Sequence, residues 1–64
     1  LPAELAEIWQ ALADLTPRQR TALVLRYHQD LTVPEVAEAM GERLGTVKSL
    51  LSRALARLRD EVQP

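Results

Sequence analysis

The sequence lacks cysteine and has few aromatic, histidine and glycine residues, and these shortages exclude several classes of protein. Without cysteine there is no disulfide, no thiolate nucleophile and no cysteine metal site. The sequence has a single histidine and no glycine-rich phosphate loop, so it offers no clear pairing of a nucleophile with a base. We therefore expect neither an enzyme nor a cofactor. No apolar run approaches the roughly 18 residues that span a bilayer. These absences are compatible with an intracellular chain, and we expect a cytoplasmic protein with no membrane contact.

What is present is typical of a small helical domain. Alanine, leucine, arginine and glutamate dominate the 64 residues, and all four favour helices. A chain this short buries only about 60% of its extended surface, so its core is marginal. The chain begins at Leu1 rather than methionine, so we expect a fragment of a longer protein. Residues 1–64 are expected to form one all-α domain.

Hydrophobic periodicity and capping signals predict four helices, near residues 3–14, 17–29, 33–40 and 43–61. In the first, apolar residues recur at i, i+3, i+4 and i+7 and include Trp9, the expected core anchor. Thr16 followed by Pro17 is a start signal for the second. We expect one core built from Trp9, Leu12, Leu23, Val36, Val47, Leu51 and Leu58.

The third and fourth predicted helices are joined by a turn at a glycine. Thr32 and Glu35 form a T-x-x-E capping box with Pro34 in the first turn. Gly41 follows the third helix directly, and glycine tolerates the left-handed conformation with which many helices end. This pattern predicts a helix-turn-helix in a small four-helix domain, a three-helical core like that of a winged helix but without a wing. The alternative is that any two amphipathic helices in a small bundle need such a turn.

The two faces of the fourth helix differ in composition. At about 100° per residue, one arc is apolar and is expected to face the core: Leu44, Val47, Leu51, Ala54, Leu55, Leu58 and Val62. The opposite arc carries small or basic residues: Gly45, Thr46, Ser49, Ser52, Arg53 and Ala56. Lys48 lies at the edge of this arc. Every charged residue from Arg43 to Arg59 is basic, although the whole chain has a formal net charge of −1. Such a face favours close approach to a polyanion.

Several short motifs, in order along the chain, carry a family resemblance: Leu15-Thr16-Pro17-Arg18-Gln19-Arg20, Leu25-Arg26-Tyr27, Leu31-Thr32-x-x-Glu35-Val36-Ala37, Met40-Gly41, Gly45-Thr46-Val47-Lys48-Ser49, Arg53-Ala54 and Leu58-Arg59. Together they cover nearly the whole chain. The series resembles the fourth conserved region of bacterial sigma factors, in particular the extracytoplasmic-function group. This resemblance implies an RNA polymerase initiation factor that reads the −35 promoter element in the major groove and docks on the flap of the polymerase β subunit. It also implies an anti-sigma factor as a partner.

The resemblance places four DNA contacts on the outer face of the last helix, at Lys48, Ser49, Ser52 and Arg53. It places a fifth at Arg26, at the end of the second helix. Arginine alone among these offers a rigid bidentate fork for guanine or phosphate. Thr46 and Thr32, near helix N-termini, are expected to present hydroxyl and amide groups to phosphate. The alternative for both threonines is plain capping.

The chain departs from the family pattern at three places. Leu50 and Leu55 stand where arginines are usual, and we expect Leu50 to be partly exposed and Leu55 to pack in the core. Glu42 lies in the turn, where it would place a negative charge near the phosphates. Fewer cations weaken sequence-independent binding. We therefore expect the isolated domain to bind DNA poorly and to need the rest of the polymerase complex to hold it in place.

Two alternative functions remain open from the sequence. The effector domain of a two-component response regulator has a similar Leu-Thr-Pro-Arg opening and Thr-Val-Lys run, but Arg26-Tyr27 and the Arg53-Ala54 ending fit sigma factors better. The other alternative is a protein-interaction module, bound by an anti-sigma factor, in which Leu50 and the helical faces serve a protein partner.

Overall fold

The computed structural model describes residues 3–62, and the side chains of residues 6–60. The helices are α1 (Ala3–Asp14), α2 (Pro17–Leu23), which continues into the π-helical turn η1 (Val24–His28), α3 (Val33–Met40) and α4 (Leu44–Val62). No strand occurs within residues 3–62. The predicted all-α fold is confirmed, and each predicted helix end lies within one residue of the observed end. None of the helices in this part of the chain is long and apolar enough to cross a membrane.

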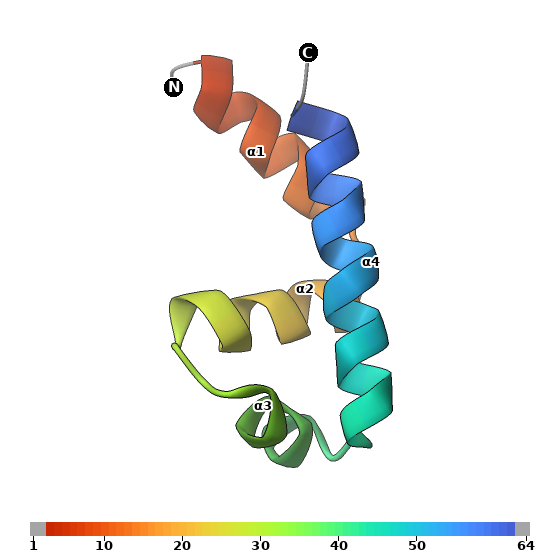
Figure 1. Cartoon of the computed structure of the whole chain (residues 1–64). Coiled ribbons are helices and arrows are strands. Elements are labelled where there is room, and N and C mark those ends of the chain that lie inside the picture. The colour runs from red at the N-terminus through yellow and green to blue at the C-terminus, as the bar shows by residue number, and fades with distance from the viewer. Residues whose placement is uncertain (1–2, 63–64) are drawn as a thin grey trace.

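α4 is the element on which the others pack. It has 19 residues and is therefore about 28 Å long. In Figure 1, α1 runs beside the C-terminal half of α4, α2 crosses its middle and α3 lies near its N-terminal end, and all three contact it. The molecule is elongated, with extents of 35 × 19 × 16 Å, because α1 and α3 lie at opposite ends of α4.

Both predicted caps form as the sequence indicates. Thr16 accepts a hydrogen bond from the backbone N–H of Gln19, and Thr32 accepts one from that of Glu35. In return, the Glu35 carboxylate accepts the N–H of Thr32 at 2.8 Å. The Thr16 cap holds the start of α2 in place, and the reciprocal bonds between Thr32 and Glu35 hold the start of α3. The chain direction is therefore fixed where both helices begin.

α3 ends at a left-handed glycine, as the sequence predicts. Gly41 has φ 65° and ψ 33°. Its N–H donates to the Glu38 carbonyl at 3.2 Å, and the N–H of Glu42 donates to the Ala37 carbonyl at 2.9 Å. These two bonds make a Schellman motif, which satisfies the last carbonyls of α3 and turns the chain into α4. The helix-turn-helix geometry is therefore built from backbone bonds that depend on one glycine.

The end of the second helix differs from the simple α-helix that its sequence predicts. The N–H of Gln29 donates to the Val24 carbonyl five residues earlier, at 3.0 Å, which makes a π-helical turn. Asp30 then takes φ 60°, a left-handed conformation that aspartate tolerates better than most residues. The helix thus reaches His28, one residue short of the predicted end, but its last turn is wider.

The core is centred on the helix-turn-helix. Leu23, Val36, Val47 and Leu51 are buried as predicted, whereas Leu12 and Leu58 are half-buried at its edge. The prediction for Trp9 is wrong, because its side chain is 62% exposed. α1 instead packs through Ala11 and Leu12, and Leu15, directly after the helix, is also buried. At about 100° per residue, Trp9 lies about 160° from Ala11, on the outer side of α1.

Two leucines of α4 are also more exposed than predicted. Leu44 is 43% and Leu55 is 39% exposed. Both lie at one edge of the predicted apolar arc, and the buried stripe formed by Val47, Leu51 and Ala54 is narrower than that arc. Leu50 lies at the other edge, where it is half-buried and packs against the core, in agreement with the prediction of partial exposure.

Candidate nucleic-acid interface

The outer face of α4 is exposed as its periodicity predicts. Lys48, Ser49, Ser52 and Arg53 are all exposed. Ser49, Ser52 and Arg53 lie opposite the buried stripe of α4, and Lys48 lies at the edge of that side. We call these four residues the outer face from here on. The structure therefore brings together, on one side of one helix, the four recognition-helix residues that the sequence singled out.

The cations of the outer face are available to a ligand. Among the described side chains, residues 6–60, the structure records no ion pair for Lys48 or Arg53. Ser49 and Ser52, between them, have short side chains, so a bound ligand can approach the backbone of α4 closely. Exposed cations beside short hydroxyl side chains can pair with phosphates and with base edges in a DNA groove.

Thr46 and Thr32 lie in different environments. Thr32 caps α3, so the capping alternative for this residue is observed, with its hydroxyl oxygen 3.3 Å from the N–H of Glu35. Thr46 lies in the first turn of α4 and is half-buried beside the outer face. In this cap the Thr32 oxygen acts as the acceptor of the Glu35 N–H.

Arg26 belongs to η1 and not to α4, and it holds a loop. Its Nη1 donates to the Leu31 carbonyl at 3.0 Å, and its guanidinium carbon lies 5.3 Å from the centre of the Tyr27 ring. The side chain is half-buried. This bond ties the end of η1 to the residue before Thr32, so Arg26 fixes the start of α3. A guanidinium has five N–H donors, so further donors remain for a phosphate.

Comparison with known proteins identifies the family. The family model described as "Sigma-70, region 4" matches residues 5–58. The RNA polymerase sigma-E factor of Streptomyces antibioticus is 46% identical over 61 residues, which are 95% of this chain and 34% of that protein. The sigma factor SigV of Bacillus subtilis is 42% identical over 53 residues, 83% of this chain and 32% of the relative.

The chain belongs to the sigma-70 region 4 family. An ECF RNA polymerase sigma factor, BldN of Streptomyces coelicolor, is 38% identical over 53 residues, 83% of this chain and 20% of that protein. The resemblance inferred from the motifs is therefore confirmed, and the response-regulator alternative is not favoured. The chain spans about a third of the length of the sigma-E relatives.

One contact of this region 4 domain was not predicted from its sequence. Nη2 of Arg18, in the first turn of α2, donates to Oε1 of Glu42 in the turn before α4. The two residues are 24 positions apart, so no helical spacing signals the pair. The only sequence signal is that Glu42 directly precedes the basic stretch from Arg43 to Arg59 and is the single acid between Glu38 and Asp60.

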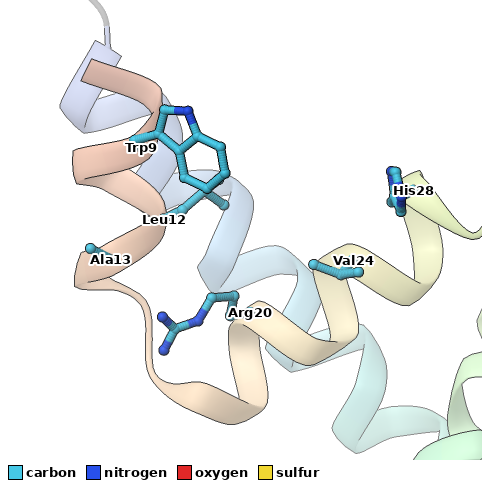
Figure 2. A pocket seen from close by; sticks show the side chains of 6 residues that line it. All are labelled: Trp9, Leu12, Ala13, Arg20, Val24 and His28. Carbon is cyan, nitrogen blue, oxygen red and sulfur yellow. The ribbon is translucent and has the colours of Figure 1, made fainter. Parts of the chain in front are cut away.

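The region 4 domain also has an apolar groove on the side of α1 and α2. The groove has a volume of about 430 Å³ and is lined by Trp9, Leu12, Ala13, Arg20, Val24 and His28. Figure 2 shows Trp9 and Leu12 on α1 and Val24 and His28 along the second helix, with Arg20 below them. Sequence reasoning missed the groove because it placed Trp9 in the core.

Proposed function

We propose that this domain recognises the −35 element of bacterial promoters during transcription initiation, as the region 4 part of an RNA polymerase sigma factor. The proposal rests on the outer face of α4, which is exposed, basic and small, and lies on the second helix of a helix-turn-helix. In this arrangement the second helix enters the major groove and its N-terminal half meets the base edges. The cytoplasm is the compartment in which such a factor acts, and the domain has a binding role rather than a catalytic one.

Within the outer face we assign different roles to the cations and the hydroxyls. Arg53 reads a base, because its planar fork can pair with guanine O6 and N7 at once. Lys48 pairs with a phosphate or with guanine as a point charge, and Ser49 and Ser52 take a base edge or a phosphate. Thr46 and Thr32 stand at helix N-termini, where backbone N–H groups and the helix dipole favour a phosphate.

The test of base reading is Arg53→Ala, measured on two duplexes. A preferred duplex is first enriched by the domain from a random library at low salt. On that duplex we expect a loss of roughly 1–3 kcal/mol, with relaxed preference at one position, and a much smaller loss on random duplexes. An equal proportional loss on both would show that Arg53 binds only the DNA backbone.

Arg26 is the matched comparison, because we assign it a phosphate. Arg26→Ala should weaken all duplexes about equally and lower the salt dependence by roughly one contact. Since Arg26 also holds the Leu31 carbonyl, amide hydrogen exchange at Thr32–Glu35 should be followed in the same variant. Loss of affinity with loosened amides and an unchanged salt slope would assign Arg26 to the loop and not to DNA.

We further propose that the apolar groove receives the flap of the polymerase β subunit. Support comes from Trp9 and Val24, which are 62% and 42% exposed, beside Arg20 and His28 on the rim. These residues suit a segment with an apolar face and an acidic edge. Trp9→Ala should weaken a pull-down of the flap and leave duplex binding unchanged. If flap binding is unchanged instead, the groove is not the polymerase contact.

An anti-sigma factor is the other protein partner that we propose for the domain. The outer flanks of α4 offer it Leu55 and the half-buried Leu50. A competition assay separates this contact from the groove. An anti-sigma factor bound to the flanks of α4 should displace the duplex before it displaces the flap.

A further inference from the structure

Glu42 is an unusual residue for a DNA-facing turn. Between Glu38 and Asp60 it is the single acidic residue of the sequence, and it lies two positions before the first residue of α4. Its backbone is fixed by the Schellman motif, through the N–H bond to the Ala37 carbonyl at 2.9 Å. A carboxylate held in this turn would repel DNA phosphates approaching the start of α4, and the repulsion would be strongest at low salt.

Arg18 contacts this carboxylate from another helix. The guanidinium belongs to the first turn of α2, and the ion pair therefore joins α2 to the turn of the helix-turn-helix. The Arg18 side chain is 57% exposed and that of Glu42 is 27% exposed, so the carboxylate is the more enclosed member. Among the described side chains, Arg18 is the only cation recorded in an ion pair with the Glu42 carboxylate.

We infer that Arg18 is a positioning residue for promoter recognition, which neutralises Glu42 and holds the start of α4 against α2. This inference rests on the proposed DNA-binding function and adds a residue outside the helix-turn-helix to it. An exposed ion pair contributes little to folding stability. The effect of Arg18 should therefore appear in DNA binding and its salt dependence, with the thermal midpoint nearly unchanged.

The rival explanation is that Arg18 contacts a phosphate directly. A double-mutant cycle separates the two, because R18Q/E42Q restores the net charge of the parent chain and removes both partners. If Arg18 acts through Glu42, R18Q should weaken duplex binding about two- to fivefold at low salt, and R18Q/E42Q should return to within about twofold of the parent. If Arg18 binds a phosphate, the loss persists in the double variant.

Glu38 supplies the matched control background. It is an exposed carboxylate one turn earlier, on α3. R18Q/E38Q has the same net charge as R18Q/E42Q but leaves Glu42 without Arg18, so it should remain as weak as R18Q. The inference is overturned if R18Q binds the duplex like the parent, if E42Q fails to rescue it, or if E38Q rescues it equally.

Arg53→Ala in the same titrations separates this inference from the proposed function. Suppose that Arg53→Ala loses affinity on the preferred duplex, and that the change in binding free energy of R18Q/E42Q equals the sum of the changes of R18Q and E42Q. Only the positioning role of Arg18 is then rejected. When the parent chain shows no preference for any enriched duplex, and Arg53→Ala binds like the parent, promoter recognition and the role of Arg18 are both rejected.

Discussion

The two ends of α4 are packed in different ways. At its N-terminal end, α2, α3 and α4 enclose branched side chains such as Val36 and Val47, both fully buried. Towards its C-terminal end, α4 meets α1, on which the small Ala11 is fully buried while the larger Trp9 stays exposed, as does Leu55 of α4. Alanine contacts let helices approach closely but bury little apolar area. The helix-turn-helix end thus buries branched apolar side chains, and the α1 end leaves Trp9 available for contact.

The largest expected effect on stability is that of Leu51→Ala, and Leu55, one turn later on α4, supplies the comparison. Leu51 is 7% exposed and belongs to the core, whereas Leu55 is 39% exposed. Leu51→Ala should lower the free energy of unfolding by about 2–5 kcal/mol, enough to unfold much of so small a domain. Leu55→Ala should lower it by less than about 1 kcal/mol. Chemical denaturation of both variants checks this, and equal losses would contradict the contrast between buried and exposed faces.

Trp9→Ala probes the other end of the molecule. Because the indole is mostly exposed, we expect a change of less than about 1 kcal/mol in the free energy of unfolding, although tryptophan is the largest side chain of the domain. Binding of the polymerase flap should fall by about 2 kcal/mol, as for an aromatic anchor in an interface. Denaturation and flap titration of one protein sample measure both. A large loss of stability would show that Trp9 is a core residue after all.

The two glycines give effects of opposite sign. Gly41 has φ 65°, and Gly45 lies inside α4, with open space around each added Cβ. Gly41→Ala should cost about 1 kcal/mol through backbone strain alone, whereas Gly45→Ala should stabilise by up to about 1 kcal/mol. If the outer face enters the groove closely, Gly45→Ala should nevertheless weaken duplex binding. Stability and affinity that both rise in Gly45→Ala would place this end of α4 away from DNA.

Leu50→Arg tests the flank between the core and the outer face. Arginine can reach a phosphate from there, so non-specific DNA binding should strengthen, with a salt dependence steeper by about 0.9. Because Leu50 packs against the core, the same change should lower the free energy of unfolding by about 1 kcal/mol. An anti-sigma factor that contacts Leu50 should bind more weakly. Tighter DNA binding with unchanged anti-sigma affinity would leave Leu50 as a packing residue only.

The smallest effect concerns the cap of α3 and its pH dependence. The backbone N–H of Thr32, and secondly its side chain, lower the pKa of the Glu35 carboxyl below its usual value. A lowered folded-state pKa adds stability above the unfolded pKa of about 4.3, and that stability is lost as pH falls through the folded value. Acid titration of unfolding should show this loss in the parent chain. Glu35→Gln, which can still accept the N–H, should lack it, and an identical acid profile would exclude Glu35 as its source.

Much of this fold could be predicted because its signals are local. The Thr16 and Thr32 caps, Gly41 and the apolar stripe of α4 each lie within a few residues of the structure they specify. Trp9 was misplaced because hydrophobicity ranks tryptophan above alanine, whereas the face of α1 that is buried carries Ala11. The Arg18–Glu42 pair joins residues 24 positions apart, so no spacing in the sequence could reveal it. The π-helical turn has no signal that distinguishes it from an ordinary helix end in this sequence. The outer face was predicted because a helix with one buried stripe must expose the opposite one.

The most direct test of the central claim is amide chemical-shift mapping of the isotope-labelled chain, titrated at low salt with the enriched duplex. Our account predicts shifts concentrated at Lys48–Arg53 and around Thr46, with amides beside Trp9 and Val24 unmoved. Raising the salt should reverse the shifts, since the contact is with phosphates as well as bases. Shifts centred on Trp9 and Val24 with none at Lys48–Arg53 would contradict the assignment of α4 to DNA.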